Sequence, residues 1–308
     1  RSEEPKDYAQ IAELQYLAFD NEEFMGETIL IDVLRHREAF DPELSLVAVL
    51  DNQIVGHILF NSFTLYHDKQ EIPAVNLAPV SVHPDYQKKG IGSRLIEIGH
   101  RLVEKKGYKV SFLWGHPEYY PRFGYNKKAF YQGGVKLNLE EIPEYNDKLK
   151  LTNPGYSDLP QLIELWKKNF YNSGLTIFPG DSIVDWVSHT KNVKTKVIKV
   201  ENNIKGYLRY SEGSENKPTM LLADNDKTLL TIMSYLKSKI EEKEDNNEFI
   251  LPLHPNSKIV KANKGDLPYK PFMVTYEAYM INYFTEEISS NIKEKGGLFI
   301  LPPHFDVA

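Results

Sequence analysis

The chain has 308 residues, no cysteine, and 37 basic against 43 acidic side chains, which gives a formal net charge of −6. The lack of cysteine excludes disulfides, thiolate catalysis and cysteine-ligated zinc, and we expect no metal site. The mixed, slightly acidic charge argues against a dedicated nucleic-acid binder, and no apolar run approaches the length that spans a membrane. The amino terminus has no signal-peptide core, so a cytoplasmic protein of two domains is expected.

Two elements are predicted before residue 61. Residues 7–19 have the apolar spacing of an amphipathic helix, with Asp7 near its start. Residues 44–60 contain two apolar runs separated by Asp51 and Asn52, residue types that accept the unusual dihedral angles of a tight turn, so they predict an antiparallel hairpin. The segment between these elements carries acids that either attract a cationic substrate or form a solvated helix face: Asp20, Glu22, Glu23 and Glu27.

Residues 75–93 run from an apolar strand through a polar turn into an amphipathic helix that starts at Gly90 and Gly92. The first N–H groups of such a helix have no partner within it and lie at the positive end of its dipole, and glycines let a phosphate approach them. The Lys-Ser/Thr pair of a P-loop and the third glycine of a dinucleotide fingerprint are both missing. Pro79, which cannot donate to a sheet, predicts a bulge or an exposed strand edge. The segment therefore predicts a site for a nucleotide pyrophosphate.

The second half of the chain repeats the first faintly. Residues 158–170 align without a gap on residues 7–19, and residues 199–206 parallel the turn of the hairpin at residues 49–56. Two matched elements in the same order favour an internal duplication over chance identity. Further elements are expected as a strand and helix within residues 219–240, a strand at residues 248–253, and closing strands of a second sheet at residues 272–281 and 298–301.

The second copy has lost the phosphate loop. Residues 222–230 contain no glycine and carry two extra acids, which would repel a pyrophosphate. The boundary between the copies is expected in the charged, proline-containing residues 140–147. Residues 241–248 are interpreted as a solvated loop.

Two segments resemble a known family. Residues 87–92, with the sequence QKKGIG, resemble the Gln/Arg-x-x-Gly-x-Gly/Ala signature of the GNAT superfamily of N-acetyltransferases. After the predicted strand at residues 110–114, residues 115–125 resemble the Gly-x-Pro-x-Tyr-Tyr-x-Arg-Phe-Gly motif of a bacterial branch of that superfamily. With the hairpin, the resemblance extends over residues 44–125.

The resemblance implies an α/β (α+β) fold in which helices flank a mixed, mostly antiparallel sheet. Acetyl-CoA is the implied cosubstrate. Together with the internal repeat, the resemblance implies a tandem arrangement. A catalytic GNAT domain is expected at residues 1–147, and a degenerate GNAT-like domain without a phosphate loop at residues 148–308.

The resemblance also implies roles for individual residues. Tyr120 is the expected acid that protonates the departing thiolate, with Tyr119 as its competitor, and the backbone N–H of Val80 is the expected oxyanion donor. The general base stays open, because Asn76 stands where the family often has a Glu; His116 and Glu118 are the nearby candidates, whereas His57 is expected to be structural. The implied contacts to acetyl-CoA are Val80 and Val82 for the pantetheine arm, and Gln87, Lys88, Lys89, Gly90, Gly92 and Ser93 for the phosphates.

The leading hypothesis is an enzyme that transfers acetyl from acetyl-CoA to a primary amine, on a small molecule or a peptide, by direct attack in a ternary complex. A non-catalytic acyl-CoA-binding sensor or interaction module is the alternative, and Asn76 favours it. A third hypothesis, an aminoacyl-tRNA-dependent transferase, is disfavoured by the acidic charge balance. Neither nucleic acid nor membrane is an expected partner, and a homo-oligomer is compatible with the sequence.

Overall fold

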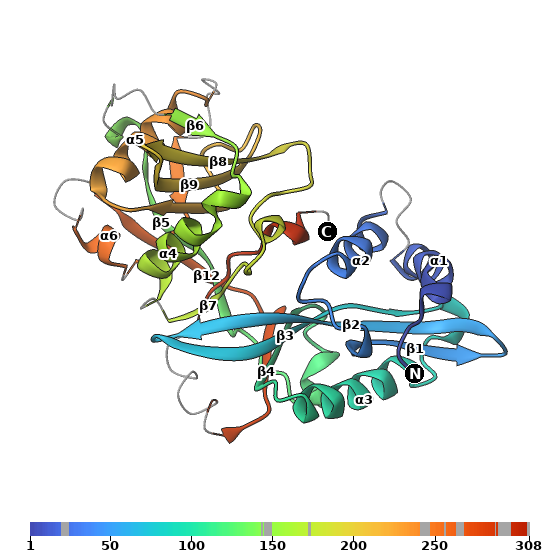
Figure 1. The fold of residues 1–308 in the computed structure, drawn as a ribbon. Helices are drawn as coiled ribbons and strands as arrows, with labels where there is room; N and C mark the ends of the chain where they lie inside the picture. Colours follow the sequence, from blue (N-terminus) through green and yellow to red (C-terminus); the bar gives the residue numbers. More distant parts are fainter. Residues whose placement is uncertain are drawn as a thin grey trace.

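The computed structural model describes residues 1–19, 25–142, 144, 150–171, 174–240, 247–255, 257–262, 268–286, 288 and 297–306. Figure 1 shows two lobes, one with α1, α2, α3 and the long strands β2 and β3, the other with α4, α5 and α6. Helices flank a ten-stranded sheet and a four-stranded sheet, and most strand pairs are antiparallel. The predicted fold class is confirmed.

Three helices enclose the first lobe's strands from both sides (Figure 1). On one side, α1 (Tyr8–Phe19) and α2 (Gly26–Arg35) bury Ile11 and Ile31 against Val47 of the sheet. On the other side, α3 (Ile91–Lys105) buries Leu95 and Ile96 against the same strands. Each fully buried aliphatic side chain of this kind contributes about 1.5–3 kcal/mol to stability.

The predicted hairpin is formed by β1 (Ser45–Leu50) and β2 (Gln53–His67). Asp51 and Asn52 form its turn with φ values of +49° and +63°, the left-handed conformation that a two-residue hairpin turn requires. The third strand, β3 (Gln70–Val82), runs antiparallel to β2, and their register shifts beside Pro79. This shift is the predicted bulge.

The strand β4 (Val110–Trp114) lies parallel to β3 but pairs with it only through Ala74, Val75 and Asn76. Beyond Asn76, β3 continues to Val82 without β4 beside it. The two central strands of the sheet therefore diverge at the bulge and leave one edge of β3 open.

The ten-stranded sheet combines strands from both halves of the chain, in the order β11-β5-β14-β7-β2-β3-β4-β13, with β1 beside β2 and β12 beside β5. Its strands from the later part of the chain are β5 (Phe130–Asn138), β7 (Leu175–Ile177), β11 (Glu248–Leu251), β12 (Lys270–Thr275), β13 (Tyr279–Tyr283) and β14 (Gly297–Leu298).

One sequence expectation about these strands is wrong. Residues 272–281 and 298–301 do not close a sheet of the second half alone. Instead, β12 pairs with β5, β13 pairs with β4, and β14 lies parallel to both β5 and β7. Because β4 would otherwise have an unpaired outer edge, β13 completes the sheet of the first lobe.

The four-stranded sheet belongs to the second half alone, with β6 (Lys150–Thr152), β8 (Val193–Val200), β9 (Asn203–Ser211) and β10 (Met220–Ala223). The helices of this half are α4 (Leu159–Phe170), α5 (Asp226–Lys237) and the short α6 (Lys258–Ala262). The expected strand and helix within residues 219–240 are β10 and α5, and the strand expected at residues 248–253 is β11.

Equivalent residues of the two halves make equivalent contacts between helix and hairpin. Gln10 of α1 accepts a hydrogen bond from the Ile54 N–H at 3.0 Å, and Gln161 of α4 accepts one from the Ile204 N–H at 2.9 Å. The turn between β8 and β9 has φ values of +49° and +67°, like the turn of the first hairpin. The helix therefore docks on the hairpin through the same side chain in both halves.

The first helices of the two halves, α1 and α4, also begin with the same kind of hydrogen bond. Asp7 accepts a hydrogen bond from the Glu4 N–H, and Asp158 accepts one from the Gly155 N–H, each at 2.8 Å. These matches support the duplication, whereas the division of the chain into domains at residue 147 stays a prediction. Parts of the predicted boundary at residues 140–147 and of the loop at residues 241–248 lie outside the described residues.

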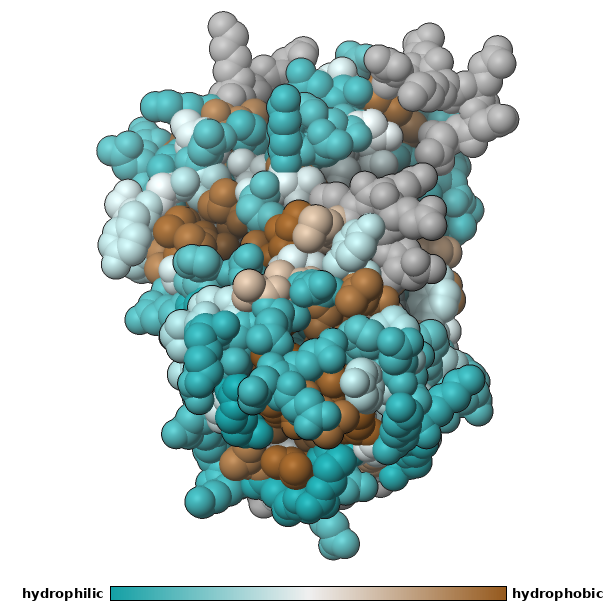
Figure 2. Space-filling view, turned by 90° about the vertical axis from the view of Figure 1, so that its right-hand side faces the viewer, coloured by the Kyte–Doolittle hydropathy of each residue, from teal (hydrophilic) through white to brown (hydrophobic). Residues whose placement is uncertain are grey.

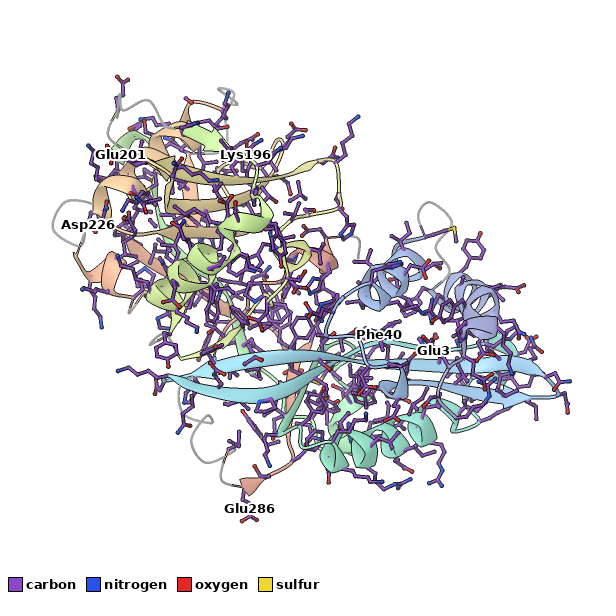
Figure 3. The ribbon with its side chains drawn as sticks, viewed as in Figure 1. Glu3, Phe40, Lys196, Glu201, Asp226 and Glu286 are labelled. Carbon is purple, nitrogen blue, oxygen red and sulfur yellow. The ribbon has the colours of Figure 1, made fainter. Side chains whose placement is uncertain are left out.

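A buried polar network joins the amino terminus to the hairpin in the region where Figure 3 labels Glu3. Arg35 donates two hydrogen bonds to Glu3, at 3.0 and 2.8 Å. His57 is fully buried, with Nδ1 3.0 Å from the Gln15 amide nitrogen and Nε2 2.9 Å from the Ser45 hydroxyl. Burial lowers the pKa of His57, so the imidazole is neutral, accepting at Nδ1 and donating at Nε2. This agrees with the structural role expected for His57.

The surface of the first lobe is mixed in character. Figure 2 shows hydrophobic residues on the viewed face in separate patches between hydrophilic side chains. Among the helices of the described residues, none combines the length and apolarity that crossing a bilayer requires.

Candidate active site

The open edge of β3 offers backbone hydrogen-bonding groups. The His83 N–H donates to the Val55 carbonyl at 3.0 Å. In an antiparallel pair these bonds recur at every second residue, so Ser81 bonds to β2 as well, and Val80 and Val82 do not. Because β4 has already diverged, the N–H groups of Val80 and Val82 face the gap between the two central strands.

The start of α3 lies beside this gap and also has free donors. Gly90 is the N-cap residue and has a φ of +82°, a conformation that costs other residues about 1–2 kcal/mol. No side chain caps the helix. Within the part of the chain that the structure describes, the N–H groups of residues 90–93 donate no hydrogen bond. These are the orphan donors that suit an anion.

A cavity of about 580 Å³ connects the two groups of donors. The sequence-predicted residues that line it are Val80, Val82, Gln87, Lys88, Gly90, Gly92, Ser93, His116, Tyr119 and Tyr120, and Tyr86, Ile91 and Arg122 line it too. Among the predicted cofactor contacts, Lys89 is absent from the lining, because its ammonium donates to the Asp85 carbonyl at 2.9 Å and lies over the Tyr86 ring. The Gln87 amide donates to the Val82 carbonyl at 3.2 Å and so links the loop to the strand.

Arg122, within the motif at residues 115–125, also lines the cavity but was not among the site residues predicted from the sequence. Its guanidinium lies over the Tyr119 ring at 4.0 Å and donates to the Ser93 hydroxyl at 3.1 Å. No carboxylate of the described residues pairs with Arg122. A cation at the amino end of a helix is unfavourable because the helix dipole is positive there. Arg122 and Lys88 together therefore make a site that favours an anion.

Gly92 lets an aromatic side chain close over the start of the helix. A Cβ atom at Gly92 would lie 3.0 Å from the Tyr119 hydroxyl and 3.4 Å from Val82. The Tyr119 ring packs edge-on against Tyr120, with a centroid distance of 5.0 Å. The tyrosine pair thus walls the cavity opposite β3.

Tyr120 has the properties of a neutral proton donor. Burial, with a smaller contribution from Tyr119, raises the pKa of its phenol above its usual range. No residue that the structure describes forms a hydrogen bond with the phenol, although the cavity reaches it. The hydroxyl is therefore protonated at physiological pH and available to a ligand.

The candidate bases differ in their positions. His116 lines the cavity. Glu118 is exposed and pairs with Lys127 at 2.8 Å, outside the cavity lining. Asn76 is fully buried, donates to the Phe112 carbonyl at 3.2 Å, and has an amide oxygen without a partner among the described residues. An amide at this position cannot accept a proton as a carboxylate would.

The equivalent helix start in the second half is closed. At α5 the Asn225 side chain caps the helix and accepts a hydrogen bond from the Thr228 N–H at 2.9 Å. Acids stand on both sides of this cap, at Asp224 and at Asp226, which Figure 3 labels in the second lobe. A side chain already occupies the place of an anion, and the Asp224 carboxylate is paired with Lys205 at 3.2 Å.

The predicted acceptor side can be followed only in part. Glu27 lies in the first turn of α2. The other acids of this segment, Asp20, Glu22 and Glu23, lie outside the described residues.

Comparisons with known proteins agree with this geometry. Residues 1–127 match the family described as acetyltransferase (GNAT) domain. Over 124 residues the chain is 37% identical to the uncharacterized N-acetyltransferase YjhQ of Escherichia coli K12, and the match covers 40% of this chain and 66% of that protein. It is 29% identical to YhbS, another uncharacterized N-acetyltransferase of E. coli K12, over 28% of this chain and 51% of YhbS. The chain thus spans between about half and two thirds of these relatives.

A solved structure extends the likeness of the fold to the second half. A protein from Enterococcus faecalis V583, described as a probable N-acyltransferase, superimposes with a TM-score of 0.67 at 14% identity. The match covers 92% of this chain and 72% of that one. At this identity the likeness concerns the fold alone.

Proposed function

The chain belongs, through its residues 1–127, to the GNAT superfamily of N-acetyltransferases, and on this premise we propose that it transfers acetyl from acetyl-CoA to a primary amine. The observation that carries the proposal is the start of α3. Four free N–H groups, Lys88 and Arg122 gather there beside the open edge of β3. This is an arrangement for a pyrophosphate followed by an extended arm that accepts strand-like hydrogen bonds.

In the proposed complex, the pyrophosphate of acetyl-CoA lies against residues 88–93, and Arg122 supports it from the side. The pantetheine arm runs along Val80 and Val82 as an additional strand in the gap left by β4. This places the thioester near the bulge at Pro79. The cavity volume of about 580 Å³ is within the range of cofactor sites.

The proposed reaction begins when the neutral amine attacks the thioester carbonyl carbon. The carbonyl oxygen becomes an oxyanion, which accepts a hydrogen bond from the Val80 N–H. When the C–S bond breaks, the CoA thiolate takes a proton from Tyr120, which recovers one from solvent. The nitrogen releases its surplus proton to His116, directly or through a water molecule. The amide and the CoA thiol are the products.

The high pKa of Tyr120 is compatible with this role. A thiol in water has a pKa of about 8.5, so full transfer from a phenol of much higher pKa would be uphill. Burial raises the pKa of a thiol as it raises that of a phenol. Burial in the closed site therefore makes the thiolate a stronger base than it is in water, and a hydrogen bond from Tyr120 stabilises the leaving thiolate as the proton is transferred.

The second half is proposed to be a related fold without cofactor. The repeated contacts of Gln10 and Gln161 support common ancestry of the two halves. The side-chain cap of Asn225 at the start of α5 argues against a second pyrophosphate site. Strand β13 supports β4, which leads directly into the segment that contains His116 and Tyr120.

A thiol-release assay with acetyl-CoA and a panel of amines, peptides and antibiotics tests the proposal. We expect release of CoA that depends on a primary amine, and no release with tertiary amines of the same shape. Binding of acetyl-CoA without release on any amine would favour the alternative, a non-catalytic acyl-CoA sensor, which the amide at Asn76 supports.

A further inference from the structure

A second cavity lies in the other lobe, away from the α3 site. It has a volume of about 350 Å³ and is bounded by β9, β5, β11, β12 and the segment after β14. Alternate residues of β12 and the residue after it turn one apolar face toward it. The apolar side chains of the lining include Phe272, Val274, Tyr276 and Phe299.

One cation is buried at the inner wall of this cavity. Arg209 is only 1% exposed. Its Nε donates to the Thr219 hydroxyl at 2.8 Å, and one terminal nitrogen donates to the Leu301 carbonyl. The other terminal nitrogen, Nη1, is buried and has no hydrogen-bond partner among the described residues. A buried charged group with an unused donor is costly unless a ligand satisfies it.

The charges around Arg209 fit a singly charged anion. Lys217 is exposed at the rim of the cavity and pairs with no carboxylate that the structure describes. Asp306 lines the same cavity and forms no ion pair with Arg209, and its buried Oδ2 has no hydrogen-bond partner among the described residues. Two cations and one carboxylate leave one positive charge in excess. That excess balances a monoanion, whereas a phosphate dianion would face the Asp306 carboxylate uncompensated.

We propose that this cavity binds a small monocarboxylate with an apolar body. The carboxylate accepts hydrogen bonds from Arg209 Nη1, since a guanidinium is the cation best matched to a flat carboxylate. The apolar body lies against Phe272, Val274 and Phe299. The site is separate from the acetyl-CoA site, and its existence does not depend on acetyl transfer.

Calorimetric titration of the whole chain with phenylpropionate tests the proposal. We expect one site per chain with a Kd in the millimolar range or tighter. Phenethylamine is the matched control ligand, because it has the same ring and chain with a cation in place of the carboxylate. We expect no binding of phenethylamine, since Arg209 and Lys217 repel it.

A pair of variants at Val274 tests the location. Val274 lines the cavity and is 37% exposed, so polar replacements are compatible with folding. Val274→Glu places a like charge in the same cavity as the ligand's carboxylate and should weaken phenylpropionate binding by about tenfold or more, whereas the neutral Val274→Gln should retain most of it. Arg209→Gln should abolish binding, and its circular dichroism spectrum checks that it is folded.

Three results would overturn the proposal. The first is the absence of phenylpropionate binding to the unchanged chain at millimolar concentrations. The second is equal affinity for phenylpropionate and phenethylamine, which would indicate unspecific apolar binding. The third is equal affinity in Val274→Glu and Val274→Gln, which would place the site elsewhere.

Discussion

Replacement of Gly90 by Glu tests the phosphate site most sharply, because the structure also supplies its control. A Cβ atom at Gly90 meets nothing within 4 Å, so the new side chain has room, although its φ of +82° strains it by about 1–2 kcal/mol. Gly107, at the other end of α3, has a φ of +91° and is equally open. Gly107→Glu therefore carries the same added charge and a similar strain without a carboxylate at the cavity.

The expected loss of affinity follows from the added charge. A carboxylate about 6 Å from one phosphate charge, at an effective dielectric constant of about 20, opposes binding by about 3 kcal/mol. Salt screening reduces this repulsion to roughly half for each phosphate charge. Because the pyrophosphate carries two such charges, the total repulsion is again about 3 kcal/mol. Gly90→Glu should thus weaken acetyl-CoA binding on the order of 100-fold in a calorimetric titration. Gly107→Glu should bind like the parent chain.

Either of two results would refute this reasoning. Parental affinity in Gly90→Glu would mean that the phosphates do not lie at the start of α3. An equal loss in Gly107→Glu would mean that backbone strain, and not charge at the cavity, explains the effect.

Three further predictions concern other parts of the molecule. Tyr120→Phe should lower turnover by about 100-fold or more with acetyl-CoA affinity unchanged, and equal turnover in a thiol-release assay would exclude Tyr120 as the acid. Burial favours a raised pKa for Glu3, but hydrogen bonds from His57, Arg35 and Ser45 outweigh it and lower the pKa from 4.5 to about 2. The carboxylate therefore stabilises the fold by about 3 kcal/mol above pH 4.5 and loses this as the pH falls toward 2, so Glu3→Gln should cost more in urea unfolding at pH 7 than at pH 3, and an equal cost would contradict the network. Removal of residues 148–308 takes β7 and β13 from β2 and β4, so the remaining fragment should aggregate or lack a cooperative thermal transition, and a soluble fragment that melts cooperatively would show an independent domain.

Local chemistry is what made parts of the fold predictable. Asp51 and Asn52 mark a turn because few residue types accept positive φ, and Pro79 marks a bulge because it cannot donate to a ladder. The strand, glycine turn and helix around Gly90 are likewise a local pattern. Each of these features depends on neighbours in sequence, and each is present in the structure.

Pairing between distant segments was not predictable in the same way. Nothing in residues 279–283 indicates that β13 completes the sheet beside β4, because register follows from burial and from the competing edges of the whole fold. Strand β5 contains the pair Gly133 and Gly134, which weakens the usual strand signal.

For the candidate site, too, the residues in local motifs were predictable from the sequence, whereas contacts between distant segments were not. Tyr120 and the loop residues were identified through motifs, and the cavity lining includes all of them except Lys89. Arg122 was not predicted as a cavity residue because its bond to the Ser93 hydroxyl joins segments 29 residues apart. The sequence motif contains the arginine, but it does not indicate where the side chain of that arginine lies.

Hydrogen exchange of the whole chain, with and without acetyl-CoA, tests the central claim most directly. The N–H groups of residues 90–93, and those of Val80 and Val82, have no partner among the residues that the structure describes and should become protected when acetyl-CoA is added. The start of α5, at residues 224–230, should exchange at the same rate in both states. Unchanged exchange at residues 90–93 in the presence of bound acetyl-CoA, or new protection at residues 224–230, would contradict the account.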